Sequence, residues 1–199
     1  MSRRQKKTAT QAGQVRIIAG KWRGRRLDFP SLDGLRPTGD RVRETLFNWL
    51  QPDLPGALCL DLFAGSGALG FEAASRGARL VTLIEKDPSA VKALLRTRDQ
   101  LGASSPELEI IQQDALAWLQ KNTSETRHFD IVFVDPPFSS PLAEWALIAL
   151  TRHHWLSPGA LVYVESGVSS GHPAITPPSW QLYRHRKMGA VQCSLYRCA

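Results

Sequence analysis

Residues 57–70 read Ala-Leu-Cys-Leu-Asp-Leu-Phe-Ala-Gly-Ser-Gly-Ala-Leu-Gly. The first seven of these residues have the apolar density of a parallel strand that is buried on both faces. The Gly-Ser-Gly that follows lets the backbone turn sharply and come close to a ligand before a helix begins. The stretch therefore predicts a strand, a glycine loop and a helix, the unit that opens a nucleotide-binding α/β domain.

The glycine loop by itself leaves the kind of nucleotide open. Gly65, Gly67 and Gly70 match the Gly-x-Gly-x-x-Gly pattern of dinucleotide sites, which is weak evidence when it stands alone. The next predicted strand, 80–85, ends in Glu85, an acid suited to hold the ribose hydroxyls of either kind of nucleotide. A second motif is needed to separate the two.

That second motif is the stretch 132–138, Val-Phe-Val-Asp-Pro-Pro-Phe, an apolar strand that ends in an acid, two prolines and an aromatic ring. The prolines stiffen the loop, so Asp135 and the carbonyl of Pro136 can accept hydrogen bonds from an exocyclic amine while Phe138 stacks on the base. The alternative is an ordinary Pro-Pro turn after a buried strand. Together with the glycine loop, the motif favours chemistry on the amine of a base. A nicotinamide enzyme has no use for a loop that binds such an amine.

These two motifs carry a resemblance. The segment 61–67 resembles the S-adenosylmethionine loop of class I methyltransferases, and 135–138 resembles the (Asn/Asp/Ser)-Pro-Pro-aromatic signature of those that methylate exocyclic amines. The resemblance implies that Glu85 holds the cofactor's ribose and that Asp114, with Ala115, holds its adenine amine. It implies that Asp61 orients the loop and the methionine ammonium. The implied cofactor residues are Asp61, Phe63, Ala64, Gly65, Ser66, Gly67, Glu85, Asp114 and Ala115, and the implied catalytic residues are Asp135, Pro136 and Phe138.

A narrower resemblance comes from the N-terminal blocks 16–25, 35–38 and 40–50, which are similar to the bacterial RsmD family. Its members methylate N2 of one guanine in 16S ribosomal RNA, so the implied partner is that RNA in the small ribosomal subunit or its assembly intermediate. The likeness extends from about Arg16 to Arg197 and departs at Ala19, where glycine is usual, and in the first dozen residues. Two alternatives stay open: an adenine-N6 or cytosine-N4 DNA methyltransferase, and a non-catalytic ribosome-binding factor.

The charge of the chain is concentrated near its start. The net charge is +7, and residues 1–43 hold 12 of the 25 Lys and Arg residues. Such clustering is typical of nucleic-acid binding, although a solvated basic face is the plainer explanation. We expect a disordered basic tail over 1–14 and RNA contact from Arg16, Lys21, Trp22, Arg23, Arg25, Arg26, Arg36 and Arg41, with Trp22 available for stacking.

The rest of the chain alternates strand and helix patterns. We expect strands at 57–63, 80–85, 108–112, 129–134 and 160–164, a closing antiparallel pair near 180–187 and 190–197, and helices between them. This predicts a Rossmann-like α/β class I methyltransferase fold, with a seven-stranded mostly parallel sheet and helices on both faces. The expected division is a tail (1–14), a small appendage of a hairpin and a helix that binds RNA (15–52), and a methyltransferase domain (53–199).

Four acids, Asp61, Glu85, Asp114 and Asp135, each fall at the carboxyl end of an expected strand, where open α/β sheets bind ligands. For Asp114 a helix N-cap is an equally good interpretation.

Length and composition exclude several other classes. A chain of 199 residues suits one domain, no apolar run approaches the roughly 18 residues of a membrane span, and the polar start lacks a secretory signal. We therefore expect a cytoplasmic protein. Cys59, Cys193 and Cys198 form no Cys-x-x-Cys pair, and we expect neither a disulfide framework nor a metal. A monomer is expected.

Overall fold

The middle layer of the molecule is a seven-stranded sheet with the order β5-β4-β3-β6-β7-β9-β8. The computed structural model describes residues 13–30, 38–104, 107–121, 127–137, 140–168 and 177–199. The strands are β3 (Leu58–Asp61), β4 (Leu80–Glu85), β5 (Leu108–Gln112), β6 (Phe129–Val134), β7 (Leu156–Gly167), β8 (Trp180–Met188) and β9 (Val191–Cys198). The first five are parallel, and β9 is antiparallel to both β7 and β8. The expected seven-stranded, mostly parallel sheet is confirmed.

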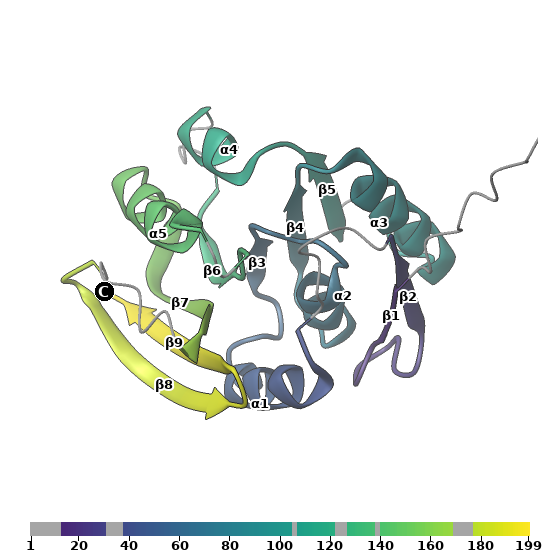
Figure 1. The fold of residues 1–199 in the computed structure, drawn as a ribbon, viewed down its shortest axis with the longest axis horizontal. Helices are drawn as coiled ribbons and strands as arrows, with labels where there is room; N and C mark the ends of the chain where they lie inside the picture. The colour runs from purple at the N-terminus through teal and green to yellow at the C-terminus, as the bar shows by residue number, and fades with distance from the viewer. Residues whose placement is uncertain (1–12, 31–37, 105–106, 122–126, 138–139, 169–176) are drawn as a thin grey trace, which may run out of the picture.

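Helices cover both faces of this sheet (Figure 1). On one face lie α1 (Asp40–Leu50), α2 (Ala68–Ser75) and α3 (Pro88–Leu101), and on the other lie α4 (Ala115–Lys121) and α5 (Leu142–Arg152). Successive strand residues point to opposite faces, so Cys59 and Phe133 join the core under α1 and α2 whereas Leu60 and Val132 join the core under α4 and α5. Burial on both faces explains why these strands are almost continuously apolar.

The hairpin β1 (Gly13–Arg16) and β2 (Arg26–Phe29) packs beside α2 and α3 rather than on the sheet itself (Figure 1). Its turn is held by α2, because Lys21 N donates to the Ser75 carbonyl and Trp22 N donates to Ser75 Oγ at 3.0 Å. β1 begins at Gly13, so the last two residues of the expected tail belong to a strand. Residues 1–12, the remainder of that tail, lie outside the described part of the chain.

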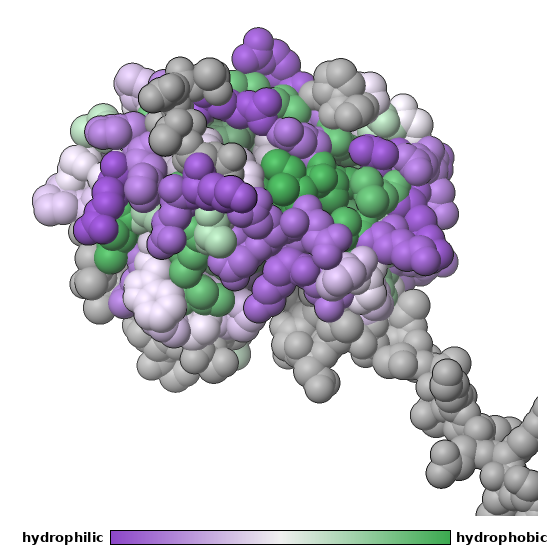
Figure 2. Space-filling view, turned by 90° about the horizontal axis from the view of Figure 1, so that it is seen from above, coloured by the Kyte–Doolittle hydropathy of each residue, from purple (hydrophilic) through white to green (hydrophobic). Residues whose placement is uncertain are grey.

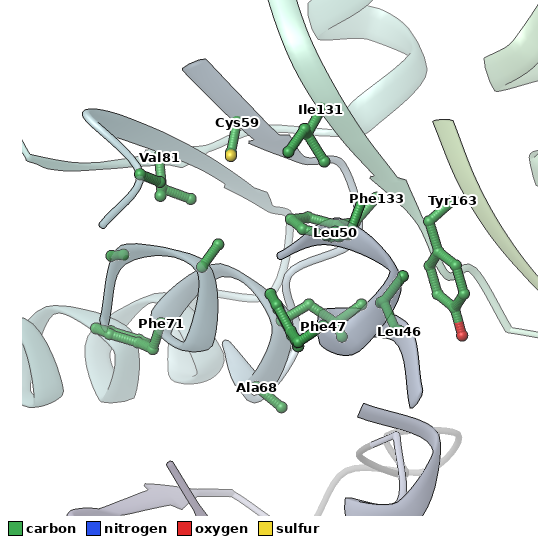
Figure 3. Packing of buried hydrophobic residues seen from close by; sticks show 14 of the residues in the cluster. Leu46, Phe47, Leu50, Cys59, Ala68, Phe71, Val81, Ile131, Phe133 and Tyr163 are labelled. Carbon is green, nitrogen blue, oxygen red and sulfur yellow. The ribbon is translucent and has the colours of Figure 1, made fainter. Parts of the chain in front are cut away.

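The appendage and the sheet share one hydrophobic core. Figure 3 shows Leu46, Phe47 and Leu50 of α1 packed under Phe133 of the sheet. Leu27 and other hairpin residues belong to the same cluster of buried side chains. The core therefore continues across residue 52, where we expected the appendage to end and the methyltransferase domain to begin.

The structure corrects what we expected of the Trp22 ring. We expected its ring to be available for stacking on RNA, but it is only 9% exposed and belongs to the hydrophobic core. Burial in the core and the Lys21 ammonium, 4.3 Å from the ring centroid, take up the surface that stacking would need. Trp22 anchors the hairpin to the domain instead.

β7 is longer than the expected strand 160–164. It starts at Leu156, and its register against β6 shifts between Phe129 and Ile131. Pro158 and Gly159, with a positive φ at Gly159, look like a turn in the sequence but form an irregularity within the strand.

The surface is mixed in polarity. Figure 2 shows hydrophilic residues spread over much of one face around a hydrophobic stretch. Among the described residues, no helix is long and apolar enough to cross a membrane.

Candidate active site

A cavity of about 1000 Å³ opens at the carboxyl ends of the parallel strands. This volume is at the upper end of the roughly 300–1,000 Å³ that ligand sites occupy, so the cavity has room for more than a small ligand. It lies at the switch point of the sheet, because β4 follows β3 on one side and β6 pairs with β3 on the other. One half is lined by Asp61, Phe63, Ala64, Gly65, Ser66, Glu85, Asp114 and Ala115, and the other by Thr38, Asp135, Pro136, Glu165 and the segment 188–191.

The glycine loop forms the wall of the first half. Gly65 and Gly67 have φ values of 51° and 76°, in the left-handed region that favours glycine. A Cβ on Gly67 would lie 2.5 Å from Phe71 Cδ2 and 2.6 Å from Leu94 Cδ2. A larger side chain at this position would therefore collide with the core under α2 and α3.

Asp61 ties the loop to the start of α2. Its Oδ2 accepts a hydrogen bond from Gly70 N at 3.0 Å, and its side chain is buried. Burial and, after it, the charge of Asp135 raise the pKa of Asp61 to about 7, while the Gly70 hydrogen bond opposes the shift. A carboxyl group in this state favours a positively charged neighbour.

Glu85 holds the same loop from the neighbouring strand. Its Oε2 accepts from Gly65 N at 2.8 Å, and its Oε1 accepts from Asp87 N at 2.8 Å. Each carboxylate oxygen has a second lone pair, so Glu85 can still accept a ligand hydroxyl. The structure therefore shows one role, loop positioning, that the sequence did not indicate, and the ribose contact stays a prediction.

Asp114 is an N-cap, the alternative that the sequence left open. Its Oδ1 accepts from Leu116 N and Ala117 N, both at 3.0 Å, at the start of α4. Asp114 and Ala115 also line the cavity. Contact with an adenine amine stays a prediction for both.

The second half of the cavity is built around Asp135, at the end of β6. This side chain is partly buried, and its Oδ2 accepts from Thr38 Oγ1 at 2.8 Å. Burial raises the pKa of Asp135 to about 6, and the hydrogen bond from Thr38 opposes the rise. Pro136 is buried beside it, whereas Phe138 lies outside the described residues.

Glu165 is a site residue that the sequence analysis missed. It is 5% exposed, lines the cavity at the end of β7, and its Oε2 accepts from the Tyr163 hydroxyl at 2.9 Å. Burial and the charge of Asp135 raise the pKa of Glu165 to about 8. The other acids were found because each falls at the carboxyl end of an expected strand. The same rule would have found Glu165, because it directly follows the strand expected at 160–164.

Two acids with raised pKa values, Asp135 and Glu165, line this half of the cavity. Burial is the main cause at both, and the charge of Asp135 adds to the rise at Glu165. This half of the cavity thus offers several oxygen acceptors. Such a lining suits a group that donates N–H bonds.

The basic residues expected to contact RNA divide between two places. Lys21, Arg23 and Arg25 are exposed at the hairpin turn, where Lys21 pairs with Glu107 and Arg25 Nη2 donates to the Gln100 carbonyl at 2.8 Å. This turn adjoins the carboxyl ends of α2 and α3, at the opposite edge of the sheet from the cavity. Arg16 and Arg26 are exposed in the hairpin strands, Arg41 is exposed on α1, and Arg36 lies outside the described residues.

Arg43 is one of the 12 basic residues within 1–43, but the structure buries it completely. Its guanidinium donates to the Arg16 carbonyl at 2.9 Å and to Asp40 Oδ1 at 2.6 Å, and Nη1 lies 3.5 Å from Glu72 Oε2. Glu72, also fully buried, accepts from the backbone of Ile18 at 2.7 Å. The pair therefore joins the hairpin, α1 and α2 and is not available to RNA.

The set of groups in the cavity fits S-adenosylmethionine, which carries a sulfonium and an ammonium beside a nucleoside. The acids lining the cavity suit those positive groups, and the glycine loop lets the backbone approach. In the described parts of the chain, no cluster of three or more His, Cys, Asp or Glu residues could hold a metal ion.

Comparison with known proteins agrees with this geometry. The family model described as Conserved hypothetical protein 95 matches residues 15–197. Ribosomal RNA small subunit methyltransferase D of Haemophilus influenzae is 48% identical over 190 residues, covering 96% of this chain and 97% of that protein. The solved structure of yhhF from Escherichia coli superposes with a TM-score of 0.83 at 43% identity, covering 94% of this chain and 98% of that one. The solved complex of SMU.776 with SAH shares the fold, with a TM-score of 0.64 at 13% identity over 86% of this chain and 53% of that one.

Proposed function

Because this chain belongs to the Conserved hypothetical protein 95 family, the RsmD family, and is an S-adenosylmethionine-dependent methyltransferase, we propose that it methylates N2 of one guanine in 16S ribosomal RNA. The relative named above as a small-subunit ribosomal RNA methyltransferase, nearly half identical and matched over almost its whole length, supports the RNA substrate. The choice of an amine as the acceptor atom rests on the second half of the cavity.

The observation that carries the proposal is the acid pair at one wall of the cofactor cavity. Asp135, held by Thr38, and Glu165, held by Tyr163, present oxygen acceptors where an amine must lie to reach the cofactor. Guanine N2 bears two hydrogens, and its neighbour N1 bears another. The carboxyl oxygens of the two acids can accept such hydrogens.

The residues of this half align the amine and manage its proton. S-adenosylmethionine supplies the methyl group on a positively charged sulfur. Asp135, ionised above about pH 6, accepts one N2 hydrogen, and the Pro136 carbonyl accepts the other, so that the nitrogen lone pair points toward the first half. As the nitrogen gains positive charge, the bond to Asp135 strengthens, which stabilises the transition state more than the ground state. The carboxylate then takes the proton that the methylated amine releases. Phe138 is proposed to stack on the base.

The first half holds the cofactor. Glu85 is proposed to accept the ribose hydroxyls, Asp114 and Ala115 to bind the adenine amine, and Asp61 to face the methionine ammonium. Phe63, Ala64, Gly65, Ser66 and Gly67 form the loop along which the backbone approaches the ligand.

The substrate is proposed to be 16S ribosomal RNA in the small ribosomal subunit or an intermediate of its assembly, in the cytoplasm, with the protein acting as a monomer. The exposed residues Arg16, Arg23, Arg25, Arg26 and Arg41 are proposed to neutralise phosphates. A contact from the hairpin turn would lie about 12 Å or more from the cofactor loop, since the eight residues of α2 separate them.

The test is methyl transfer to small ribosomal subunits from bacteria that lack the family enzyme, with the product mapped by mass spectrometry. The parent protein should form N2-methylguanine at one position. Asp135→Asn should lower kcat by a factor on the order of 100 or more, since it removes the charged acceptor, while S-adenosylmethionine affinity stays within a few fold. Asp99→Asn, a change of the same kind at an exposed site on α3, should act as the parent does. Methyl transfer to another base, or equal loss of cofactor binding and rate in Asp135→Asn, would contradict the proposal.

A further inference from the structure

The end of strand β8 reaches the rim of the active site. Because β9 lies antiparallel between β7 and β8, β8 runs parallel to β7, and its carboxyl end lies at the same edge of the sheet as the cavity. Figure 1 shows β8 ending beside α1. Thr45 Oγ1 of α1 donates to Met188 Sδ at 3.7 Å, which joins the two elements there.

A second cavity, of about 330 Å³, lies at this junction and has a basic lining. It is lined by Arg41 and Val42 of α1 and by Arg186, Lys187, Met188 and Gly189. No acid is among these lining residues. The nearest acids on α1 are Asp40, which pairs with Arg43, and Glu44, which lies one turn beyond Arg41.

The strand register places one arginine on the α1 side of the sheet. Arg186 lies opposite Cys193, a member of the core under α1, and paired residues of antiparallel strands share a face. Lys187 therefore lies on the other face, at the same end of the strand. Arg41, Arg186 and Lys187 are all exposed.

None of the three cations has a carboxylate partner within the described part of the chain. Three neighbouring uncompensated cations favour an anion from outside the chain. Arg41 adds to this from the first turn of an 11-residue helix, whose amino end carries partial positive charge.

The two cavities adjoin. Val42, Met188 and Gly189 line both, so the basic junction lies directly beside the target half of the larger cavity. The larger cavity has Asp61, Asp135 and Glu165 in its lining, which disfavour a phosphate inside it. The charges therefore orient a nucleotide with its base inward and its phosphate at the junction.

We propose that Arg41 and Arg186, with Lys187, form a subsite for a backbone phosphate next to the target guanine. This rests on the proposed function and adds a second basic surface, separate from the hairpin. The subsite fixes the register of the RNA strand, so that the target base and no neighbour enters the cavity.

The test uses the double variant Arg41→Gln/Arg186→Gln. The control is Arg79→Gln, the same change at an exposed residue just before β4, at the end of the strands away from the cavity. The probe is unmethylated 16S ribosomal RNA assembled with small-subunit ribosomal proteins. For the double variant, the slope of log affinity against log salt should fall by roughly 0.7 to 0.9 for each lost contact. The RNA KM should rise on the order of tenfold, with S-adenosylmethionine affinity unchanged. Arg41→Lys/Arg186→Lys should restore the slope, since each lysine keeps its charge.

Different results separate failure of the subsite from failure of the proposed function. If the parent neither binds nor methylates the particle, the proposed function fails. If the parent is active and the double variant keeps both slope and KM, the subsite is wrong. Inorganic phosphate, titrated as a competitor at constant ionic strength, distinguishes the source of the phosphate. If phosphate binds the parent but RNA binds the parent and the double variant equally well, the site takes the free ion. That result would overturn the proposal.

Discussion

The hydroxyl of Thr38 favours the ionised form of Asp135. Burial raises the pKa of Asp135 to about 6, and the Thr38 hydrogen bond limits that rise. In Thr38→Val the bond is lost, so the pKa of Asp135 should rise and the acidic limb of the pH–rate profile should move to higher pH. The measurement is kcat/KM from pH 5 to 8. Thr151→Val, which removes a hydroxyl bonded within α5, is the control, and an unmoved limb in Thr38→Val would exclude Asp135 as the group that must ionise.

Glu85 combines two tasks in one carboxylate, since it binds the backbone of Gly65 and is proposed to bind ribose. Glu85→Gln should weaken S-adenosylmethionine binding by roughly 1.5 to 3 kcal/mol, because a charged acceptor becomes a neutral amide. Calorimetry measures this directly. Glu109→Gln, which alters a partly exposed pair with Arg127, should leave the affinity unchanged. Equal affinity in parent and Glu85→Gln would reject the ribose assignment.

At the scale of elements, the buried pair Arg43 and Glu72 joins the hairpin, α1 and α2. Removing one partner of a buried pair leaves a charge that burial penalises, so Arg43→Met should lower the free energy of unfolding by roughly 3 kcal/mol. Arg76, which also binds Glu72 at 2.7 Å, keeps the loss from being larger.

The matched control for that change is Arg98→Met, which breaks a pair with the exposed Asp99. Exposed pairs contribute about 0 to 1 kcal/mol, so urea unfolding should distinguish the two variants. Similar midpoints for both would show that the buried pair does not hold the appendage to the domain.

For the whole molecule, the acids of the cavity make stability depend on pH. The folded-state pKa of Glu165, about 8, is above its ordinary value of 4.5, so the folded protein binds more protons than the unfolded chain between these values. The stability that this group contributes is complete below about pH 4.5 and is lost as the pH rises to about 8. Glu165→Gln should therefore lose less stability than the parent between pH 5 and pH 8.5.

Thermal unfolding at several pH values without ligand measures this difference. Glu109→Gln, which removes a carboxyl group outside the cavity, is the control. Parallel curves for the parent and Glu165→Gln would mean that Glu165 titrates normally in the folded protein.

The sequence by itself determined the α/β fold and pointed to residues that line the cavity, among them Gly65, Glu85 and Asp114. The strands 80–85, 108–112 and 129–134 have the expected bounds, since each is an apolar run between turn or capping residues. Asp87 caps α3, accepting from Ser89 N and Ala90 N, and Pro88 begins the helix, a local signal that can be read from the sequence. Such features are local, because strand pattern, cap and glycine turn depend on neighbours in the chain.

Only the tertiary structure decided which distant residues meet. The chain order does not say that β9 inserts between β7 and β8, yet this brings Arg186 to Arg41 and the active-site rim. In the same way, Arg43 and Trp22 look like surface residues in a basic segment, but packing against α2 buries both. Burial and pairing are set by contacts between segments far apart in sequence, which hydrophobic periodicity does not encode. The raised pKa of Glu165 has the same origin, since it comes from burial and from the charge of Asp135 on another strand.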